Sequence, residues 1–372
     1  MRKVLFFLLS DMIGGGERYA ITLINALLKN TFSVKVLILA GSLEKYLKNY
    51  DYVILPFGKP LAKYRGLSLH FDLLLKNKFI KNLKPHFQQY NPELIFMQYL
   101  KEKILFTEYF SKMGVPILWT EHGVLPFWIT KNPVLKYYYL KNAAKPQKII
   151  AISKQGKDSL INIGVTEDKI ELIYNGIDTC KFKPDLKAKD SIYIGTISSL
   201  TESKGISDFI KFAEYLFLSE LKNKIKIEIA GKGPLENSIL RLVSKYNDRV
   251  KFYGFIDNPE DIISKWDIFI NPSRGMGEGL PFRVLEAMAC GLIVVSTETG
   301  AVNEVIKDGF NGFLIKPQKI DSWLQLIKQI VSSIEKYNFL KKNAENTIKN
   351  NFSEKIMLDK TLKVFYESCI SH

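Results

Sequence analysis

Two glutamates, Glu278 and Glu286, stand eight residues apart across the start of a predicted helix, and glycines crowd the loop before that helix. The apolar run 268–270 before the loop is typical of a buried strand, and the run 282–288 after it is typical of a helix that Pro281 can open. A glycine loop between a strand and a helix presents backbone amides and the positive end of the helix dipole to an anion. Carboxylates accept hydrogen bonds from hydroxyl groups. The segment therefore predicts a ligand that carries both phosphate and hydroxyl groups.

Short apolar runs alternate with helical spacing along both halves of the chain. In the first half, a helix is expected over 17–30, and strands are expected over 4–9, 34–39, 94–98, 117–120 and 148–152. In the second half, helices are expected over 206–221 and after 231–234, and strands over 191–197, 225–230, 250–253, 267–271, 292–296 and 312–315. Three more helices are expected at the C-terminus. Short apolar strands separated by helices are typical of a parallel sheet covered on both faces.

The chain of 372 residues is too long for one ordinary core. An Asn-Gly turn and a lysine cluster interrupt the periodicity within 175–190. We expect an α/β protein of two facing, Rossmann-like, doubly wound domains, 1–180 and 181–352, with a ligand cleft between them. A C-terminal helix, 353–372, is expected to pack back on the first domain.

Composition excludes several classes of protein. Hydrophobic residues make up 47% and aromatic residues 12% of the chain, which indicates a globular protein. The three cysteines, Cys180, Cys290 and Cys369, lack the spacing of a disulfide framework or a zinc site and favour a reducing compartment. The N-terminal apolar run is short and is followed by Asp11, which favours a first strand over a signal peptide. No apolar run is long enough to span a membrane.

Positive charge is concentrated in the first part of the chain. The net charge is +15, and residues 1–150 hold 22 Lys and Arg against 9 Asp and Glu. A basic half indicates an anionic partner, which can be a membrane surface, a nucleic acid or a phosphorylated substrate. The alternative is a solvated surface without a partner. No nucleic-acid-binding module is recognisable, and we expect no nucleic acid partner.

Several segments, taken in order and spacing, resemble the retaining glycosyltransferases of family 4, which have two Rossmann-like domains in the GT-B architecture. The matching segments, besides the glutamate segment, are 14–17 (GGGE), 121–123 (EHG), 151–154 (AISK), 174–178 (YNGID), 198–205 (SSLTESKG), 230–235 (AGKGPL), 252–255 (FYGF), 300–305 (GAVNEV) and 311–312 (NG). The resemblance covers essentially the whole chain. It implies that the first domain faces the acceptor and that the second binds a nucleotide sugar.

The resemblance also implies roles for individual residues. Glu278 matches the glutamate on the donor sugar, His122 a histidine near the transferring sugar and Lys204 a lysine on the diphosphate; these three are the candidate catalytic residues. Glu286 matches the glutamate that holds the donor ribose. The remaining positions expected to bind the donor are Gly15, Gly16, Ser199, Gly233, Phe255, Ile256, Gly279, Leu280, Pro281, Phe282 and Arg283. Glu17 either caps a helix or takes part in the site.

One departure from the family concerns the diphosphate. The family pattern has an arginine where this chain has Ser199, so that a bidentate charged contact is replaced by a hydroxyl. Either Arg283 or Arg274 supplies the missing charge, or donor binding is weaker. A second departure is the glycine-rich insertion around 274–277. A non-catalytic GT-B-like scaffold with weakened donor binding is therefore the alternative to an enzyme.

The chemistry that follows is transfer of a sugar from a nucleoside diphosphate. The developing charge on the leaving diphosphate has to be stabilised, and Lys204, helix N-termini and loop amides supply that without a metal. The sequence has no Asp-X-Asp motif at a strand end, so we expect metal-independent transfer and no cofactor apart from the donor. The resemblance implies retention at the anomeric carbon. UDP-sugars are expected ahead of GDP-sugars as donors.

Two stretches of the first domain mix lysines with apolar side chains, 59–84 and 127–139. Basic residues beside exposed apolar residues favour contact with an anionic membrane surface. The alternative is an amphipathic helix that covers the sheet. The first reading predicts a cytoplasmic protein, peripheral on the inner face of the membrane, with a glycan or lipid-linked acceptor in cell-surface polysaccharide or lipopolysaccharide synthesis.

Overall fold

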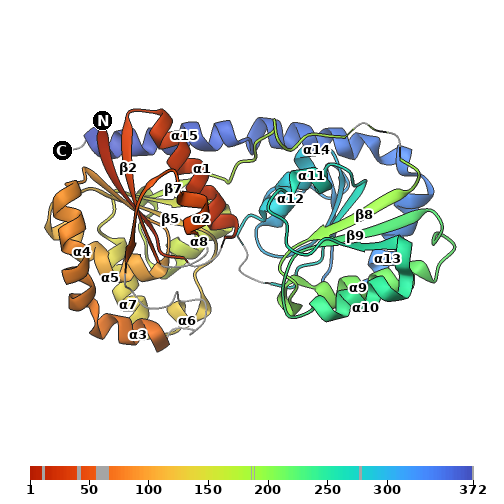
Figure 1. Ribbon diagram of the computed structural model, residues 1–372, viewed down its shortest axis with the longest axis horizontal. Coiled ribbons are helices and arrows are strands. Elements are labelled where there is room, and N and C mark those ends of the chain that lie inside the picture. The colour runs from red at the N-terminus through yellow and green to blue at the C-terminus, as the bar shows by residue number, and fades with distance from the viewer. Residues whose placement is uncertain are drawn as a thin grey trace. The chain divides into compact units, whose positions relative to one another are not determined.

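The computed structural model describes residues 1–10, 13–39, 43–55, 67–185, 187, 189–275 and 279–370. Internal contacts divide the chain into two compact units (Figure 1). The first comprises residues 1–174 together with 357–372, and the second comprises residues 175–356.

The first unit is built on a seven-stranded parallel sheet in the order β3-β2-β1-β4-β5-β6-β7. Its strands are β1 (Arg2–Leu8), β2 (Phe32–Leu39), β3 (Asp51–Leu55), β4 (Leu94–Met97), β5 (Ile117–Glu121), β6 (Lys148–Ala151) and β7 (Ile170–Leu172). The five strands predicted here are confirmed, whereas β3 and β7 at the two edges were not predicted. The strand order reverses between β1 and β4, and in an open α/β sheet ligands bind where the order reverses.

Helices cover both faces of this sheet. They are α1 (Gly15–Lys29), α2 (Glu44–Leu47), α3 (Leu67–Leu74), α4 (Lys76–Tyr90), α5 (Leu100–Lys112), α6 (Phe127–Thr130), α7 (Pro133–Ala143), α8 (Lys154–Ile163), the 3₁₀ helix η2 (Glu167–Lys169) and, from the other end of the chain, α15 (Glu354–Ile370). The predicted helix over 17–30 is confirmed as α1.

Alternation along β1 explains why both faces are covered, because successive side chains of a strand point to opposite faces. Leu5 and Phe7 belong to a buried core shared with α4, α5 and α7. Phe6, on the opposite face, contacts the ring of Phe96, which in turn contacts Phe365 of α15. The C-terminal segment 357–372, which contains Phe365, therefore belongs to the first unit although the chain passes through the second unit before it.

The second unit holds a six-stranded parallel sheet in the order β10-β9-β8-β11-β12-β13. The strands are β8 (Ile192–Ile197), β9 (Ile225–Ala230), β10 (Val250–Phe252), β11 (Ile268–Asn271), β12 (Ile293–Thr297) and β13 (Phe313–Ile315). All six match the predicted strands within a residue or two. The strand order reverses between β8 and β11.

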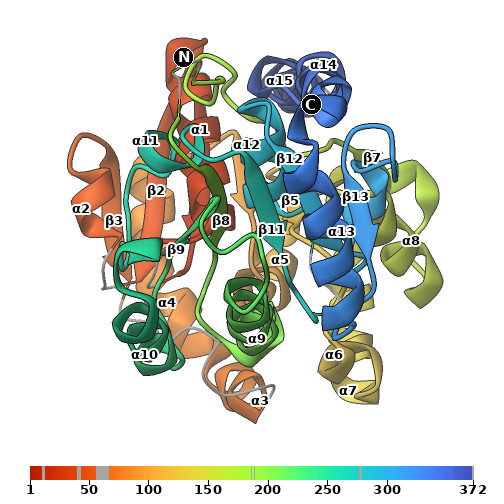
Figure 2. The same ribbon diagram turned by 90° about the vertical axis from the view of Figure 1, so that its right-hand side faces the viewer.

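The helices of the second unit pack on the two faces of its sheet. They are α9 (Ile206–Phe217), α10 (Glu236–Tyr246), α11 (Glu260–Ile263), α12 (Phe282–Ala289), α13 (Ile320–Ser332) and α14 (Asn338–Asn351), with the 3₁₀ helices η3 (Glu202–Lys204), η4 (Asn247–Arg249), η5 (Val302–Glu304) and η6 (Ile334–Tyr337). Side chains of α9, α10 and α13 form one core with β8, β9, β11 and β12. Helices α12 and α14 pack together against β12 on the other face (Figure 2). Within the ranges that the structure describes, no helix has the length and apolar character needed to cross a bilayer.

Candidate functional site

The glycine loop after β1 leads directly into α1 and lies against two side chains distant in sequence. Glu17, in the first turn of α1, accepts a hydrogen bond at 2.8 Å from the Gly14 amide and a short one from the Tyr99 hydroxyl. A Cβ added to Gly16 would stand 3.0 Å from the Tyr99 hydroxyl and 3.6 Å from Nε2 of His122. The structure therefore brings together the predicted residues Gly16 and His122, and it gives Glu17 a role in holding the loop.

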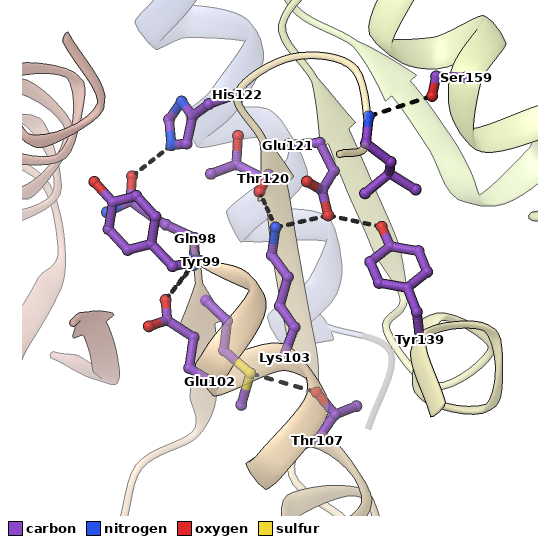
Figure 3. A network of polar contacts seen from close by, with 12 residues as sticks. Gln98, Tyr99, Glu102, Lys103, Thr107, Thr120, Glu121, His122, Tyr139 and Ser159 are labelled. Atoms are coloured by element: carbon purple, nitrogen blue, oxygen red, sulfur yellow. Dashed lines mark hydrogen bonds and ion pairs between the residues drawn. The ribbon is translucent and has the colours of Figure 1, made fainter. Parts of the chain in front are cut away.

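His122 follows the end of β5 and is partly buried (Figure 3). Its Nε2 is 3.0 Å from Oε1 of Gln98, and its ring meets the edge of the Tyr19 ring. Burial, and then the positive charge of Lys103, lower the pKa of His122 from its ordinary value. The lowered pKa favours the neutral imidazole at physiological pH.

A buried ionic network fixes the strand end from which His122 projects (Figure 3). Lys103, which is fully buried on α5, donates to the carbonyl of Thr120 at 2.5 Å and to the Glu121 carboxylate at 2.7 Å. The hydroxyl of Tyr139 donates to the same carboxylate oxygen at 2.7 Å. Burial lowers the pKa of Lys103, and the neighbouring Glu121 carboxylate opposes that shift. The two residues before His122 are thus held through both main chain and side chain.

Glu102 caps the same helix from its first turn. Its Oε1 accepts the amides of Gln98 at 2.6 Å and Tyr99 at 2.8 Å. Burial raises the pKa of Glu102 to about 7, although these two amides act in the opposite direction. The carboxyl group therefore fixes the residues that contact His122 and Glu17.

The Glu102 carboxyl makes the stability of the protein depend on pH. Its pKa is raised on folding, so the stability it contributes is complete below the unfolded pKa near 4.5 and is lost as the pH rises through about 7. The loss amounts to up to about 3 kcal/mol. Glu102→Gln should remove this dependence, so the fall in urea midpoint between pH 5 and pH 8 should be smaller in the variant. An equal fall in both proteins would contradict the assignment.

In the second unit, the turn that carries Lys204 packs against the loop after β11. Lys204 ends η3 and is partly buried. Gly205 follows at φ +68°, and a Cβ there would stand 1.8 Å from the carbonyl oxygen of Pro272. Only glycine fits this position, both for its positive φ and for the close approach.

The loops after β8, β9 and β10 meet at the same edge of this sheet. Ser199 is exposed, and a Cβ on Gly233 would stand 2.6 Å from the carbonyl oxygen of Leu200. The amide of Gly231 donates to the carbonyl of Gly254 at 2.8 Å, beside the half-exposed Phe255 and the partly buried Ile256. Because carboxyl ends of parallel strands share one edge, Ser199, Gly233, Phe255 and Ile256 lie in connections at the same edge of this sheet.

The strand and the helix expected around the two glutamates are confirmed as β11 and α12. Glu278 lies outside the described residues. Leu280 is buried, Gly279 is partly buried, and Pro281 stands at the N-cap with Phe282 as the first helical residue. Glu286 is 4% exposed and accepts a hydrogen bond at 2.6 Å from Arg283, one turn earlier on α12.

Both arginines considered as substitutes at the diphosphate are ion-paired. Arg283 pairs with Glu286, and Arg274 pairs with Asp208 and Glu202. Asp208 lies in the first turn of α9, and Glu202 lies in η3 beside Lys204.

Sequence reasoning missed Gln98, Tyr99, Lys103 and Asp208. Their partners lie far away along the chain, and only the tertiary fold brings them together. A weak signal was present, because Glu102 and Lys103 open a helix directly after a buried strand. Charged residues in the first turn of a helix that packs on a sheet become buried, and buried charges need partners.

The three cysteines are free thiols: Cys180 is exposed, Cys290 buried and Cys369 partly buried. Among the residues with described positions, no group of three His, Cys, Asp or Glu is arranged to hold a metal ion.

Two family models match the chain in succession. "Glycosyltransferase Family 4" matches residues 13–181, and "Glycosyl transferases group 1" matches residues 178–347.

Individual relatives show the same likeness. An uncharacterized glycosyltransferase of Methanocaldococcus jannaschii is 30% identical over 250 residues, which are 62% of this chain and 62% of that protein. UDP-Gal:alpha-D-GlcNAc-diphosphoundecaprenol alpha-1,3-galactosyltransferase of Escherichia coli is 28% identical over 283 residues, which are 69% of this chain and 71% of that protein. The chain thus spans less than two thirds of the length of the first of these relatives.

Solved structures show a likeness over the full length. HepE of Anabaena in complex with UDP superposes with a TM-score of 0.80 and 18% sequence identity, covering 99% of this chain and 100% of that one. At this identity the likeness is evidence of the fold. The predicted GT-B fold class is confirmed.

Proposed function

Because the chain belongs to the glycosyltransferases of group 1 and family 4, a family of nucleotide-sugar-dependent hexosyltransferases, we propose that it transfers a hexosyl group from a UDP-sugar to a glycan or lipid-linked acceptor. Transfer proceeds with retention and without a metal ion. The observation that carries the proposal is the arrangement at the carboxyl edge of the second sheet, where Lys204 follows β8, Gly233 follows β9, and α12, which carries Glu286, follows β11.

The donor is bound by groups of these loops. Glu286 accepts hydrogen bonds from the ribose hydroxyls, because a nearly buried carboxylate held by Arg283 is oriented to accept them. The amides of 279, 280 and 282 at the start of α12 face the sugar and phosphates, while Pro281 has none to donate. Phe255, which is 51% exposed beyond β10, offers a ring face to the base.

Catalysis consists of stabilising the leaving group. The anomeric C–O bond to the diphosphate breaks, and Lys204 and the N-terminus of α12 stabilise the negative charge that develops there. The acceptor hydroxyl attacks the same face of the sugar and passes its proton to the leaving phosphate. Glu278 contacts the donor sugar. His122, kept neutral by its surroundings, hydrogen-bonds to the sugar as it transfers.

Nucleotide binding tests this function directly. A ligand that binds only the folded state stabilises it by about 2.7 kcal/mol at a hundredfold excess over Kd. UDP should therefore raise the melting temperature, and should do so more than GDP or ADP. If none of the three nucleotides changes the melting temperature, the donor proposal fails. If UDP binds but no UDP-sugar is turned over, the chain is a non-catalytic GT-B-like scaffold, which is the alternative suggested by Ser199 in place of the family arginine.

A lipid-linked acceptor is supported by the relative from Escherichia coli, whose name specifies a diphosphoundecaprenol-linked sugar. The surface of the first unit fits such an acceptor. Helices α3, α6 and α7 lie at the same end of that unit in both views (Figures 1 and 2). Together with the first turns of α4, which carry Lys78 and Lys81, they expose a set of large apolar side chains among lysines, here called the docking surface: Phe71, Leu74, Phe127, Val134, Tyr137, Lys78, Lys81 and Lys131. We place this surface on the anionic inner face of the cytoplasmic membrane, where the protein takes part in surface polysaccharide or lipopolysaccharide synthesis.

Removing apolar area from the docking surface should weaken membrane binding. Leu74 is 82% exposed, so Leu74→Ser together with Phe127→Ser should leave folding intact and lower the affinity for anionic phospholipid vesicles at least tenfold. Leu218→Ser is the matched control, because Leu218 is 79% exposed but lies at the end of α9 in the second unit. Equal vesicle binding by the double variant and the wild type, measured by co-sedimentation, would show that the docking surface is merely solvated.

A further inference from the structure

Arg274 reaches from the loop after β11 to the start of α9. Its Nε donates to Oδ2 of Asp208 at 2.5 Å, its Nη2 donates to the other oxygen of that carboxylate, and its Nη1 donates to Glu202 at 3.2 Å. The Asp208 side chain is 4% exposed. A planar fork on a nearly buried carboxylate is a contact that arginine makes and lysine cannot reproduce.

Main-chain contacts also join the two segments that this ion pair connects. The amide of Arg274 donates to the carbonyl of Ser203 at 2.8 Å. One residue beyond Lys204, Gly205 packs directly on the carbonyl of Pro272. The turn that carries Lys204 and the start of the β11–α12 connection are therefore held together by side chain and main chain at once.

The charge of Arg274 is matched locally. One guanidinium faces the two carboxylates of Asp208 and Glu202, so the cluster carries no surplus of positive charge. Asp208 also raises the pKa of Arg274 above its ordinary value by accepting its hydrogen bonds. A diphosphate that took the Nε–Nη2 fork of Arg274 would have to displace Asp208 and leave that carboxylate unpaired in a nearly buried position, which is strongly unfavourable.

We propose that Arg274 is a positioning residue, which holds the turn that presents Lys204 against the β11–α12 connection and does not itself bind the donor diphosphate. The proposal rests on the function proposed above, since it concerns the same donor site.

Asp208→Asn separates the two roles by the sign of its effect. If Arg274 were a phosphate ligand, loss of its competing carboxylate would free the guanidinium and raise the affinity for UDP. If Arg274 positions the Lys204 turn, Asp208→Asn should lower the affinity for UDP about tenfold, as should Arg274→Ala. The double variant should be no weaker than either single variant, because both remove the same interaction. Titration calorimetry with UDP measures all four proteins.

The effect should depend on the phosphates. Uridine affinity should change less than about twofold in Arg274→Ala, because uridine carries no group for Lys204 to bind. Arg274→Lys should fail to restore UDP affinity, since an ammonium cannot form the fork. Arg241→Ala, which removes an exposed arginine of α10, is the matched control and should bind UDP as the wild type does. Tighter UDP binding by Asp208→Asn, or unchanged binding by Arg274→Ala, would overturn the proposal.

Amide hydrogen exchange tests the positioning role without nucleotide. Arg274→Ala should speed exchange in 199–206 and in 271–275 together, while Arg241→Ala should change neither segment. Unchanged exchange in 199–206 of Arg274→Ala would overturn the positioning role, whether or not the wild type binds UDP. Absence of UDP binding by the wild type would contradict only the proposed donor.

Discussion

Lys103→Met should lower the stability of the protein by about 3–5 kcal/mol, because it leaves the buried Glu121 carboxylate without its cation. Lys103 is fully buried, and its ammonium also holds the carbonyl of Thr120. With an m-value of about 2–3 kcal/mol/M in urea, the transition of the first unit should move down by about 1–2.5 M. Trp119, which packs beside the ammonium, contributes one of the four tryptophan signals that follow unfolding by fluorescence.

A surface lysine of the same helix provides the control. Lys112 also pairs with a glutamate, Glu108, but its side chain is 74% exposed, so Lys112→Met should change stability by less than about 1 kcal/mol. Combining Lys103→Met with Glu121→Gln should recover part of the loss, because the unpaired charge is then removed. Equal urea midpoints for Lys103→Met and Lys112→Met would contradict the role of the network.

Glu286→Ala should lower the affinity for UDP by about 1.5–3 kcal/mol, or roughly 10- to 150-fold, because it removes a charged acceptor of two ribose hydroxyls. Glu286 is nearly buried and fixed by Arg283, so its geometry is set before the donor binds. The loss should be similar for uridine and UDP, since both carry the ribose. This pattern differs from that of Arg274→Ala, whose effect should need the diphosphate.

The control for Glu286 is a carboxylate away from the site. Glu220 pairs with Lys328 at 3.5 Å on an exposed surface, and Glu220→Ala should leave UDP affinity unchanged. Melting temperatures of both variants show whether the folded state persists. Unaltered uridine binding by a folded Glu286→Ala protein would remove Glu286 from the ribose site.

The elements of this fold were readable because local sequence determines them. The apolar runs 4–9 and 268–270 predict strands from their own residues, and the glycines at 14–16 and 205 reflect local backbone geometry. The edge strand β3 was missed because its apolar run is only three residues long, 53–55, and four of its five side chains are not buried. Edge strands carry a weaker hydrophobic signal for that reason.

The contacts that position the candidate site were less predictable. Lys103 and Glu121 are 18 residues apart, and Arg274 and Asp208 are 66 residues apart. No periodicity relates such pairs, because strand order and helix packing decide which charges meet. Arg274 was considered as a phosphate ligand from its place beside the glutamates, whereas its ion pair with Asp208 appears only in three dimensions.

Sugar transfer itself is the most direct test of the central proposal. The purified protein should transfer radiolabelled hexose from one of a panel of UDP-sugars to a polyprenyl-diphosphate-linked sugar, and the label should move to the lipid phase. Glu278→Gln should abolish that transfer while its melting temperature stays close to that of the wild type. Transfer at the wild-type rate by a folded Glu278→Gln protein would contradict the proposed function. So would a wild-type protein that neither binds nor transfers sugar from any UDP- or GDP-sugar.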